Sequence, residues 1–488
     1  MALGTIGAPS LVRQLAGWRS TASAADPGWR QLARAIRLLL RDGRLPLDNR
    51  MPGERDLAAA LGVSRTMVTA AYTQLREEGF IMSRQGSGSL TCLPDRHASG
   101  PAAPPPPLGE GTIDMSCAAL PATSSVYTAF EDAVADLPQW LRGDGYDYPG
   151  IAPLRAAIAA GYAARGCPTD PDQILVTSGA QSALALLLHV LTAPGDRIAV
   201  DHPTYHNGLI AIARASCRAV PVMLSRDGWD MDGMAAVLRQ ANPRLAYIVA
   251  DNSNPTGQSM DIAARRALVD MATRSRTALV VDETMLECWI DAAPPPPVAA
   301  FDRDGVVISI GSLGKRFWGG LRIGWIRAEP SMIARLSAYR PSFDLGSPVM
   351  EQLVATRLLT QDQRVEDAER RALLRARRDH LAGLVERHLP EWRFDLPAGG
   401  LSLWVELPTP VSTALAAMAE GMGLRIAPGP RFGVDGAFER FVRLPFTLPE
   451  ERQREGVEIL ARCWAQLRPG SGRRPASAPY EGGSMRIV

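Results

Sequence analysis

Short apolar runs of the kind that form β-strands alternate with helix-like stretches between residues 113 and 467. Such alternation is typical of a largely parallel sheet with helices between its strands. We therefore expect this region to be an α/β domain. The strand-like runs are residues 174–177, 197–200, 246–250, 278–281 and 306–310.

Composition divides the 488-residue chain, which is too long for one ordinary domain. Proline is concentrated between residues 94 and 111, as in a linker, and these 18 residues would reach on the order of 55 Å as polyproline helix. The end of the chain is rich in Gly, Ser, Pro and Arg and is expected to be disordered. The expected parts are an extension at 1–27, a first module at 28–92, a linker at 93–112, the α/β domain at 113–467 and a tail at 468–488.

Charge and cysteine usage limit the classes of protein that fit. The net charge is only +2, and residues 28–92 hold ten Arg against six acidic residues, a local balance of 10 − 6 = +4. This excess alone does not establish nucleic-acid binding. The six cysteines lack CxxC spacing, which disfavours a zinc site and a disulfide scaffold, and no apolar run is long enough to span a bilayer. We expect a soluble cytoplasmic protein without a metal site.

The first module has the pattern of a winged helix-turn-helix. A helical segment at 54–61 ends at Gly62, and Ser64 is the candidate N-cap of a second helix. In that helix Arg65, Thr66, Thr69 and Thr73 face away from the apolar side, as side chains facing a DNA groove would. A short hairpin with a glycine-rich tip follows at residues 80–91.

Three segments of this module closely resemble the GntR-type DNA-binding domain. They are Met-Pro-Gly-Glu-Arg-Asp-Leu-Ala (51–58), Leu-Gly-Val-Ser-Arg-Thr (61–66) and Tyr-Thr-Gln-Leu-Arg-Glu-Glu-Gly (72–79). Thr69 is shorter than the polar or basic side chain often found there, which would weaken one contact. The alternative is a winged-helix module for protein interaction. The resemblance implies DNA contacts by Arg55, Ser64, Arg65, Thr66, Gln85 and Gly86.

Lys315 is the only lysine, so the other 52 of the 53 basic side chains are arginine. Arginine can replace lysine as a surface charge, but its guanidinium stays protonated and cannot condense with an aldehyde. A partly buried lysine can lose its proton and form a Schiff base. The alternative is that Lys315 remained the one lysine of the chain by chance, and the surrounding sequence disfavours this alternative.

Residues 113–467 resemble fold-type I pyridoxal-phosphate enzymes, specifically the aminotransferases. The matching segments occur in family order: Val-Thr-Ser-Gly-Ala-Gln (176–181), Asp-His-Pro-Thr-Tyr (201–205), Asn-Ser-Asn-Pro-Thr-Gly (252–257), Asp-Glu (282–283) and Ser-Ile-Gly-Ser-Leu-Gly-Lys (309–315). The resemblance implies a mainly parallel sheet, a smaller carboxyl-terminal α+β subdomain and pyridoxal 5'-phosphate as cofactor.

The resemblance assigns roles to single residues. Lys315 forms the internal aldimine, and Asp282 keeps the pyridine nitrogen protonated. Tyr205 stacks on the ring, and Asn254 bonds the ring hydroxylate. Arg443 grips the substrate carboxylate with two parallel hydrogen bonds. The catalytic residues are thus Lys315, Asp282 and Tyr205. The implied phosphate ligands are Ser178, Gly179, Ala180, Ser312 and Arg322, with Tyr146 reaching the phosphate of a partner subunit.

Three positions depart from the aminotransferase pattern. Met285 replaces a tyrosine whose phenol bonds the cofactor hydroxyl, and Gly314 replaces a serine that ligates the phosphate. The segment containing Tyr146 is one residue short. These changes favour cofactor binding over efficient turnover.

A GntR-type domain joined by a long linker to an aminotransferase-like domain is the architecture of the MocR regulators. The resemblance implies a domain-swapped, head-to-tail homodimer that binds an operator and senses an amino compound through aldimine exchange at Lys315. The competing hypothesis is a catalytically active aminotransferase that carries a DNA-binding domain. A regulator that no longer uses the cofactor is a third hypothesis, which Lys315, Asp282 and Arg322 together disfavour.

Overall fold

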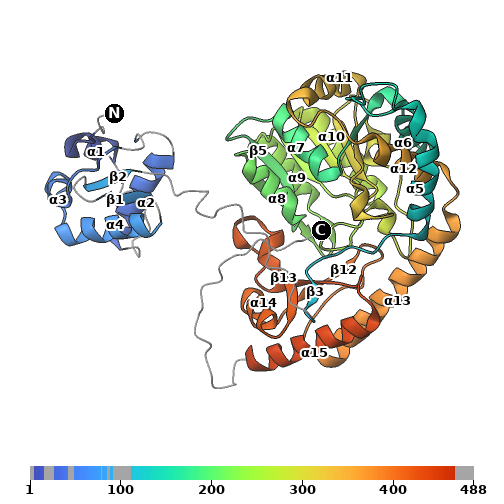
Figure 1. The fold of residues 1–488 in the computed structure, drawn as a ribbon. Coiled ribbons are helices and arrows are strands. Elements are labelled where there is room, and N and C mark those ends of the chain that lie inside the picture. Colours follow the sequence, from blue (N-terminus) through green and yellow to red (C-terminus); the bar gives the residue numbers. More distant parts are fainter. Residues whose placement is uncertain are drawn as a thin grey trace. The chain divides into compact units, whose positions relative to one another are not determined.

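The computed structural model describes residues 5–15, 27–41, 45, 49–78, 80–84, 88–91 and 111–467. The chain divides into two compact units, the first ending at Pro106 and the second beginning at Pro107 (Figure 1). Most of the linker and the whole tail from residue 468 lie outside the described residues, so the expected disorder of the tail is not addressed.

The first unit is a helix-turn-helix with a two-stranded wing. Gly62 ends the first helix of the motif in a left-handed conformation with φ of 65°, and the Ser64 Oγ caps the next helix by accepting from the Met67 amide. The predicted apolar face is confirmed, since Val68, Ala71, Tyr72 and Leu75 are buried. The elements are α1 (Ala8–Gln14), α2 (Gly28–Arg41), α3 (Glu54–Leu61), α4 (Arg65–Glu77), and the antiparallel pair β1 (Ile81–Arg84) and β2 (Gly88–Thr91).

The extension before residue 28 contributes to the core of this unit. Ile6, Leu11 and Leu15 are buried in the same apolar cluster as Leu57 of α3 and Leu75 of α4. The sequence pattern did not indicate this packing, because a helix of seven residues has too few turns for a clear apolar face.

Residues 111–467 contain an eight-stranded sheet in the order β4-β11-β10-β9-β8-β5-β6-β7. The five strands from β10 to β6 pair in parallel, whereas β11 and β7 run antiparallel to their neighbours. The predicted mainly parallel sheet is therefore confirmed. The strands are β4 (Ile174–Thr177), β5 (Arg197–His202), β6 (Arg218–Ser225), β7 (Gly228–Trp229), β8 (Leu245–Ile248), β9 (Ala278–Asp282), β10 (Val307–Ser312) and β11 (Gly324–Arg327).

Helices cover both faces of this sheet (Figure 1). Side chains alternate along each strand, so in β8 Ala246 and Ile248 join one apolar cluster while Leu245 and Tyr247 join the other. The helices on the first face are α5 (Ser124–Asp136), α6 (Ala152–Ala164), α9 (Met231–Gln240), α10 (Ile262–Ser275) and α12 (Val349–Thr360). Those on the second are α7 (Ala180–Leu191), α8 (His206–Arg214) and α11 (Pro330–Tyr339).

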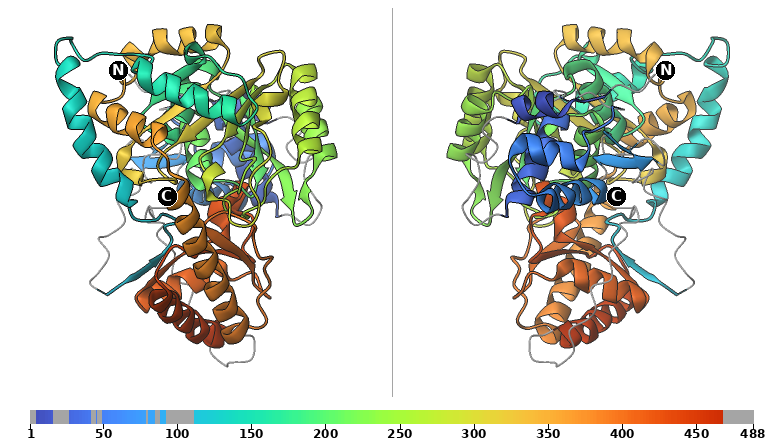
Figure 2. Two further views of the ribbon diagram at one scale, coloured as in Figure 1. Left: turned by 90° about the vertical axis from the view of Figure 1, so that its right-hand side faces the viewer. Right: turned by 90° about the vertical axis from the view of Figure 1, so that its left-hand side faces the viewer.

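A smaller subdomain is built on a four-stranded sheet in the order β12-β14-β13-β3, seen below the large sheet in both views of Figure 2. Its edge strand β3 (Ile113–Met115) lies immediately after the linker and pairs in parallel with β13. The subdomain is therefore completed by the segment that leads to the first unit. Its other elements are β12 (Ser402–Glu406), β13 (Leu424–Pro428), β14 (Phe441–Pro445), α13 (Arg364–His388), α14 (Ser412–Gly421) and α15 (Glu450–Leu467).

Among the helices that the structure describes, none is both long and apolar enough to cross a bilayer.

Candidate functional site

The candidate cofactor site lies at the carboxyl ends of the parallel strands, where ligands bind in open α/β sheets. Asp282 ends β9, and Lys315 follows β10 by three residues. Both line a cavity of about 100 Å³. In all, seven predicted site residues line it: Ala180, Tyr205, Asn254, Asp282, Ser312, Lys315 and Arg322.

Lys315 supplies to this cavity an amine that loses its proton more easily than an ordinary lysine. Burial lowers the pKa of Lys315 to about 8, so an appreciable fraction is unprotonated near neutral pH. Its Nζ donates a hydrogen bond of 2.8 Å to the Ala118 carbonyl. The amine is therefore suited to condensation with an aldehyde.

Backbone geometry at the start of α7 forms a cradle for an anion. Gly179 is the N-cap residue, with φ of 94°, and the first two residues of the helix line the cavity. Arg322 Nη2 donates to the Ser178 carbonyl at 2.9 Å, and a Cβ on Gly179 would lie 2.7 Å from the same nitrogen. Only glycine leaves room for this arginine, and the combination of a cation and helix amides fits a phosphate.

The Asp282 carboxylate is the buried acid of the site. Burial raises the pKa of Asp282, and hydrogen bonds from Thr284 and Tyr247 oppose that rise. The Thr284 amide donates to Oδ1 at 2.9 Å, and the Tyr247 hydroxyl donates to Oδ2 at 2.7 Å. No ion pair among the described residues involves Asp282, so this buried carboxylate lacks a protein cation and fits a protonated pyridine nitrogen.

Arg443, on β14, is fully buried beside the cavity. Its Nη1 donates to Asn254 Oδ1 at 3.3 Å and its Nη2 donates to the Ser116 carbonyl, while Nε has no partner among the described residues. Burial lowers the pKa of Arg443 to about 10. An incompletely bonded, buried guanidinium fits a ligand carboxylate.

The two substituted positions also face the site. Met285 is buried and lines the cavity, and its thioether cannot donate the bond of a phenol. The Gly314 amide donates to Ser312 Oγ at 3.1 Å, and a Cβ on Gly314 would lie 3.3 Å from that oxygen. A side chain at residue 314 would therefore require a small shift of Ser312.

Tyr146 does not line the cavity of its own chain. Its side chain is 60% exposed, and its backbone amide donates to Asp144 Oδ1.

Sequence reasoning missed Tyr247, Gln181 and Thr284. Gln181 and Thr284 line the cavity and lie close in sequence to predicted site residues, which was the available signal. Tyr247 carried no signal, because it lies within an apolar strand and contacts Asp282 only through the pairing of β8 with β9.

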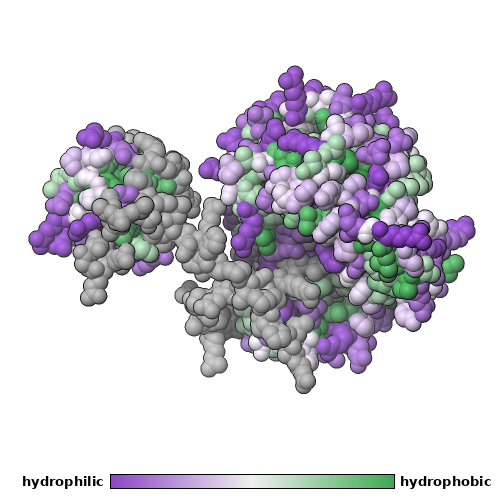
Figure 3. All heavy atoms as spheres, turned by 45° about the horizontal axis from the view of Figure 1, so that its top comes forward, coloured by the Kyte–Doolittle hydropathy of each residue, from purple (hydrophilic) through white to green (hydrophobic). Residues whose placement is uncertain are grey.

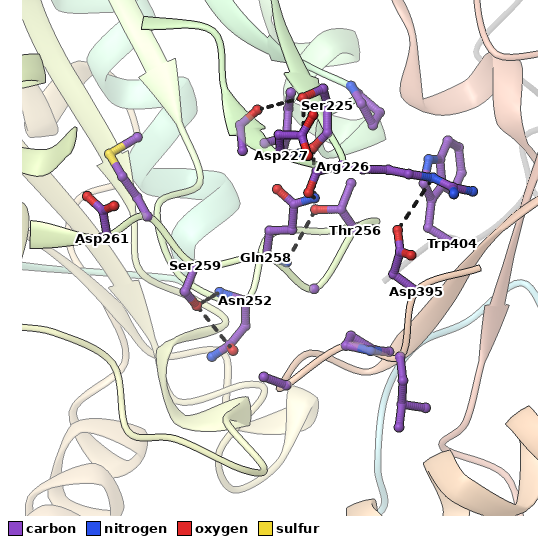
Figure 4. Close-up of a pocket in the computed structure, with 18 of the residues that line it drawn as sticks. Ser225, Arg226, Asp227, Asn252, Thr256, Gln258, Ser259, Asp261, Asp395 and Trp404 are labelled. Carbon is purple, nitrogen blue, oxygen red and sulfur yellow. Dashed lines mark hydrogen bonds and ion pairs between the residues drawn. The ribbon is translucent and has the colours of Figure 1, made fainter. Parts of the chain in front are cut away.

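A larger cleft of about 690 Å³ lies between the large sheet and the small subdomain, and none of the predicted cofactor residues lines it. Figure 4 shows Arg226 extending across this cleft toward Asp395 and Trp404. Arg226 pairs with Asp395 at 3.4 Å and with Glu406 at 3.1 Å. Trp404, which lines the cleft, is the direct neighbour of Arg443 across β12 and β14.

In the first unit, the predicted DNA-contacting residues Arg55, Ser64, Arg65 and Thr66 are exposed. The Arg65 Nε lies 4.0 Å from Glu54, which also accepts a 2.7 Å hydrogen bond from Thr69. Thr69 therefore has a partner within the unit. The predicted wing-tip residues Gln85 and Gly86 lie outside the described residues.

Comparison with known proteins shows the family of the large domain. The family model "Aminotransferase class I and II" matches residues 141–460, two thirds of the chain. The chain belongs to this family. The model "Bacterial regulatory proteins, gntR family" matches residues 29–90.

The chain is similar along most of its length to the probable rhizopine catabolism regulatory protein MocR of Rhizobium meliloti, with 27% identity over 92% of this chain and 96% of that protein. It is 30% identical to the 2-aminoadipate transaminase of Thermus thermophilus over 64% of this chain and 79% of that enzyme. The crystal structure of LysN, the alpha-aminoadipate aminotransferase of Thermus thermophilus, covers 74% of this chain and 94% of its own, at 28% identity and a TM-score of 0.66.

These matches define the protein as a GntR-type, DNA-binding transcriptional regulator of the MocR subfamily, with pyridoxal 5'-phosphate as the cofactor of its aminotransferase-like domain. Proteins with the aminotransferase fold are typically dimers.

Proposed function

We propose that this regulator senses a compound that carries both a primary amine and a carboxylate. The cofactor supplies an aldehyde carbon that condenses with primary amines. Lys315 holds that carbon until the amine of the effector replaces it, and Arg443 binds the effector carboxylate. DNA binding by the first unit changes as a result.

The observation that carries this proposal is the position of the segment from Ser116 to Ala118. Arg443 Nη2 donates to the Ser116 carbonyl, and Lys315 Nζ donates to the Ala118 carbonyl. One short segment therefore occupies donors of both ligand-binding groups. An effector carboxylate that binds Arg443 Nη2 must compete with the Ser116 carbonyl.

The same segment offers a route from the ligand to the linker. It directly follows β3 (Ile113–Met115), the first strand after residues 93–112, and β3 is an edge strand held by β13. Displacing residues 116–118 would bias the position of β3 and of the linker that precedes it. An effector acts only by binding one arrangement better than another, and this competition supplies such a difference.

A head-to-tail, domain-swapped homodimer would complete the site. Large apolar side chains are exposed on α5 and the segment after it, with Tyr127 and Leu141 each 70% exposed and Val134 58% exposed. In Figure 3 hydrophobic side chains gather on the right of the large unit, where Figure 1 shows α5 and α13. Burial of this face by a second copy would let Tyr146 reach the phosphate of the partner.

We propose that residues 28–92 form the DNA-binding domain and residues 113–467 the cofactor domain. Arg55, Ser64, Arg65 and Thr66 would contact the operator together with Gln85 and Gly86 of the wing. The exposed positions of the first four support these roles.

A slow or active aminotransferase is the second candidate function. The cavity and its surroundings retain Lys315, Asp282 and Arg443, and the similarity to a transaminase extends over most of this domain. Met285 in the cavity weighs against efficient turnover, because a thioether cannot replace the phenolic hydrogen bond.

The deciding experiment screens amino acids and amines for a change in the absorption of the bound cofactor, with operator binding followed in parallel. We expect a responsive amino acid to change both signals in the wild type and neither in Arg443→Ala. Rapid conversion of an amino donor and a keto acid, without any effect on operator binding, would instead establish an enzyme.

A further inference from the structure

Two adjacent carboxylates at the end of β9, Asp282 and Glu283, each accept a hydrogen bond from a buried tyrosine hydroxyl. We propose that Tyr247 is a positioning residue for the cofactor: its hydroxyl fixes the orientation of the Asp282 carboxylate and keeps it anionic for the pyridine nitrogen. This inference rests on cofactor binding at Lys315 and is independent of what the regulator senses.

Tyr247 is held rigidly enough for this role. It is fully buried on β8, which pairs directly with β9 in parallel, and it lies opposite Val280 in that register. Its ring packs against α8 at Gly208, where an added Cβ would lie 2.9 Å from the ring. The absence of a side chain at Gly208 therefore allows the ring to lie where its hydroxyl reaches Asp282.

The hydrogen bond has a defined direction. Burial and the neighbouring Asp282 raise the pKa of Tyr247 well above its usual value, so the phenol stays protonated and donates. The Thr284 amide donates to the other oxygen of Asp282, so both carboxylate oxygens are fixed by protein donors. Other titratable groups that act on Asp282 and Tyr247 are Glu283, Tyr205 and Asp201.

The neighbouring carboxylate of Glu283 differs from that of Asp282 in having an ion-pair partner within the protein. It accepts from Tyr162 at 2.9 Å and from Ser309 at 2.9 Å, and it pairs with Arg165 at 3.3 Å. The charge of Glu283 is thus balanced by a protein cation. Asp282 has the two donors but no cation among the described residues, so its charge remains available to the cofactor.

Tyr162 consequently provides a matched control for Tyr247. Both are almost completely buried tyrosines, and each donates to one of two neighbouring carboxylates. Replacing either by phenylalanine removes one hydroxyl without changing the shape of the ring, yet only Tyr247→Phe affects the carboxylate that faces the cofactor cavity.

The test uses the full-length protein with bound and with removed cofactor. We would measure the Kd of pyridoxal 5'-phosphate, the pH titration of its bound absorption band, and thermal unfolding without cofactor. A hydrogen bond to a charged group changes an equilibrium by about 10- to 150-fold. Tyr247→Phe should raise the Kd by about this factor and shift the titration midpoint, whereas Tyr162→Phe should keep wild-type values even if it unfolds at a lower temperature.

A double-mutant cycle with Asp282→Asn separates positioning from a general loss of stability. If Tyr247 acts through the carboxylate, Tyr247→Phe should have little further effect on the Kd once Asp282 is replaced. The inference fails if the two effects are additive, if Tyr247→Phe keeps the wild-type Kd and midpoint, or if Tyr162→Phe shifts both equally. A wild type without an absorption band would contradict cofactor binding itself.

Discussion

Replacing Arg443 by glutamine should weaken the binding of amino acids but not that of simple amines. Arg443 is fully buried beside the cavity, and the carboxylate-binding role proposed for it would distinguish amino acids from other primary amines. An amine without a carboxylate makes no use of this residue, so it serves as the internal control.

The magnitude follows from the hydrogen bonds that Arg443 already makes. Nη1 is used by Asn254 and Nη2 by the Ser116 carbonyl, whereas Nε is free of partners in the described part of the chain. A carboxylate that binds Nε and Nη2 gains one new charged hydrogen bond at Nε. At Nη2 it only replaces the existing hydrogen bond to the Ser116 carbonyl. One such bond contributes about 1.5 to 3 kcal/mol, which corresponds to about a 10- to 150-fold change in Kd.

The assay is an absorption titration of cofactor-loaded protein with a responsive amino acid and with its decarboxylated amine. Arg425→Gln is the control variant, since Arg425 is also buried in the small sheet but pairs with Glu420 at 3.1 Å. Equal losses for the amino acid and the amine in Arg443→Gln, or an equal loss in Arg425→Gln, would refute the assignment of the carboxylate to Arg443.

Four further predictions concern the cofactor lysine, the substituted tyrosine position and the recognition helix. Lys315→Arg should abolish the absorption band and any borohydride-reducible adduct, because guanidinium cannot condense with an aldehyde; a persistent adduct would show that another group carries the cofactor. Since the pKa of Lys315 is lowered to about 8 and only the neutral amine condenses, the rate of cofactor attachment to the apoprotein should rise about tenfold per pH unit below 8 and level off above it, as measured by stopped-flow absorption. Met285→Tyr should speed half-transamination of a bound amino acid, while wild-type turnover should stay below the range of about 1 to 1000 per second of ordinary enzymes in rapid-mixing experiments. Arg65→Ala should lower operator affinity by about 1 to 3 kcal/mol if Arg65 reads a base, or weaken all DNA sequences alike if it contacts phosphate, as resolved by titrations at several salt concentrations.

The sequence predicted five of the eight strands of the large sheet, because a buried strand needs a continuous apolar run that is visible without any knowledge of its neighbours. It did not predict β6, β7 or β11. The run at 174–177 matches β4 at both ends. The run at 246–250 extends two residues beyond β8, which ends at Ile248 before the chain turns into the site loop. Such turns depend on contacts with other segments, which apolarity does not report.

The motif residues of the cofactor site were also readable from sequence, because Lys315, Asp282, Gly179 and Arg322 each satisfy a chemical need that few residue types can meet. Asp282 and Lys315 converge on one cavity because of the strand order, since the carboxyl ends of parallel strands lie at one edge of the sheet. Tyr146 is different: its side chain is exposed in a single chain, and its proposed partner belongs to a second copy.

The sequence by itself determined which chemistry this protein carries: one amine among arginines, a glycine that admits an arginine, and a carboxylate at a strand end. Only the tertiary structure decided how those groups are controlled. Tyr247 reaches Asp282 because β8 pairs with β9, and the Ser116 carbonyl reaches Arg443 across 327 positions of sequence because β3 joins the small sheet. Hydrogen bonds depend on distances of a few ångströms between strands, and spacing along the chain contains no information about those distances.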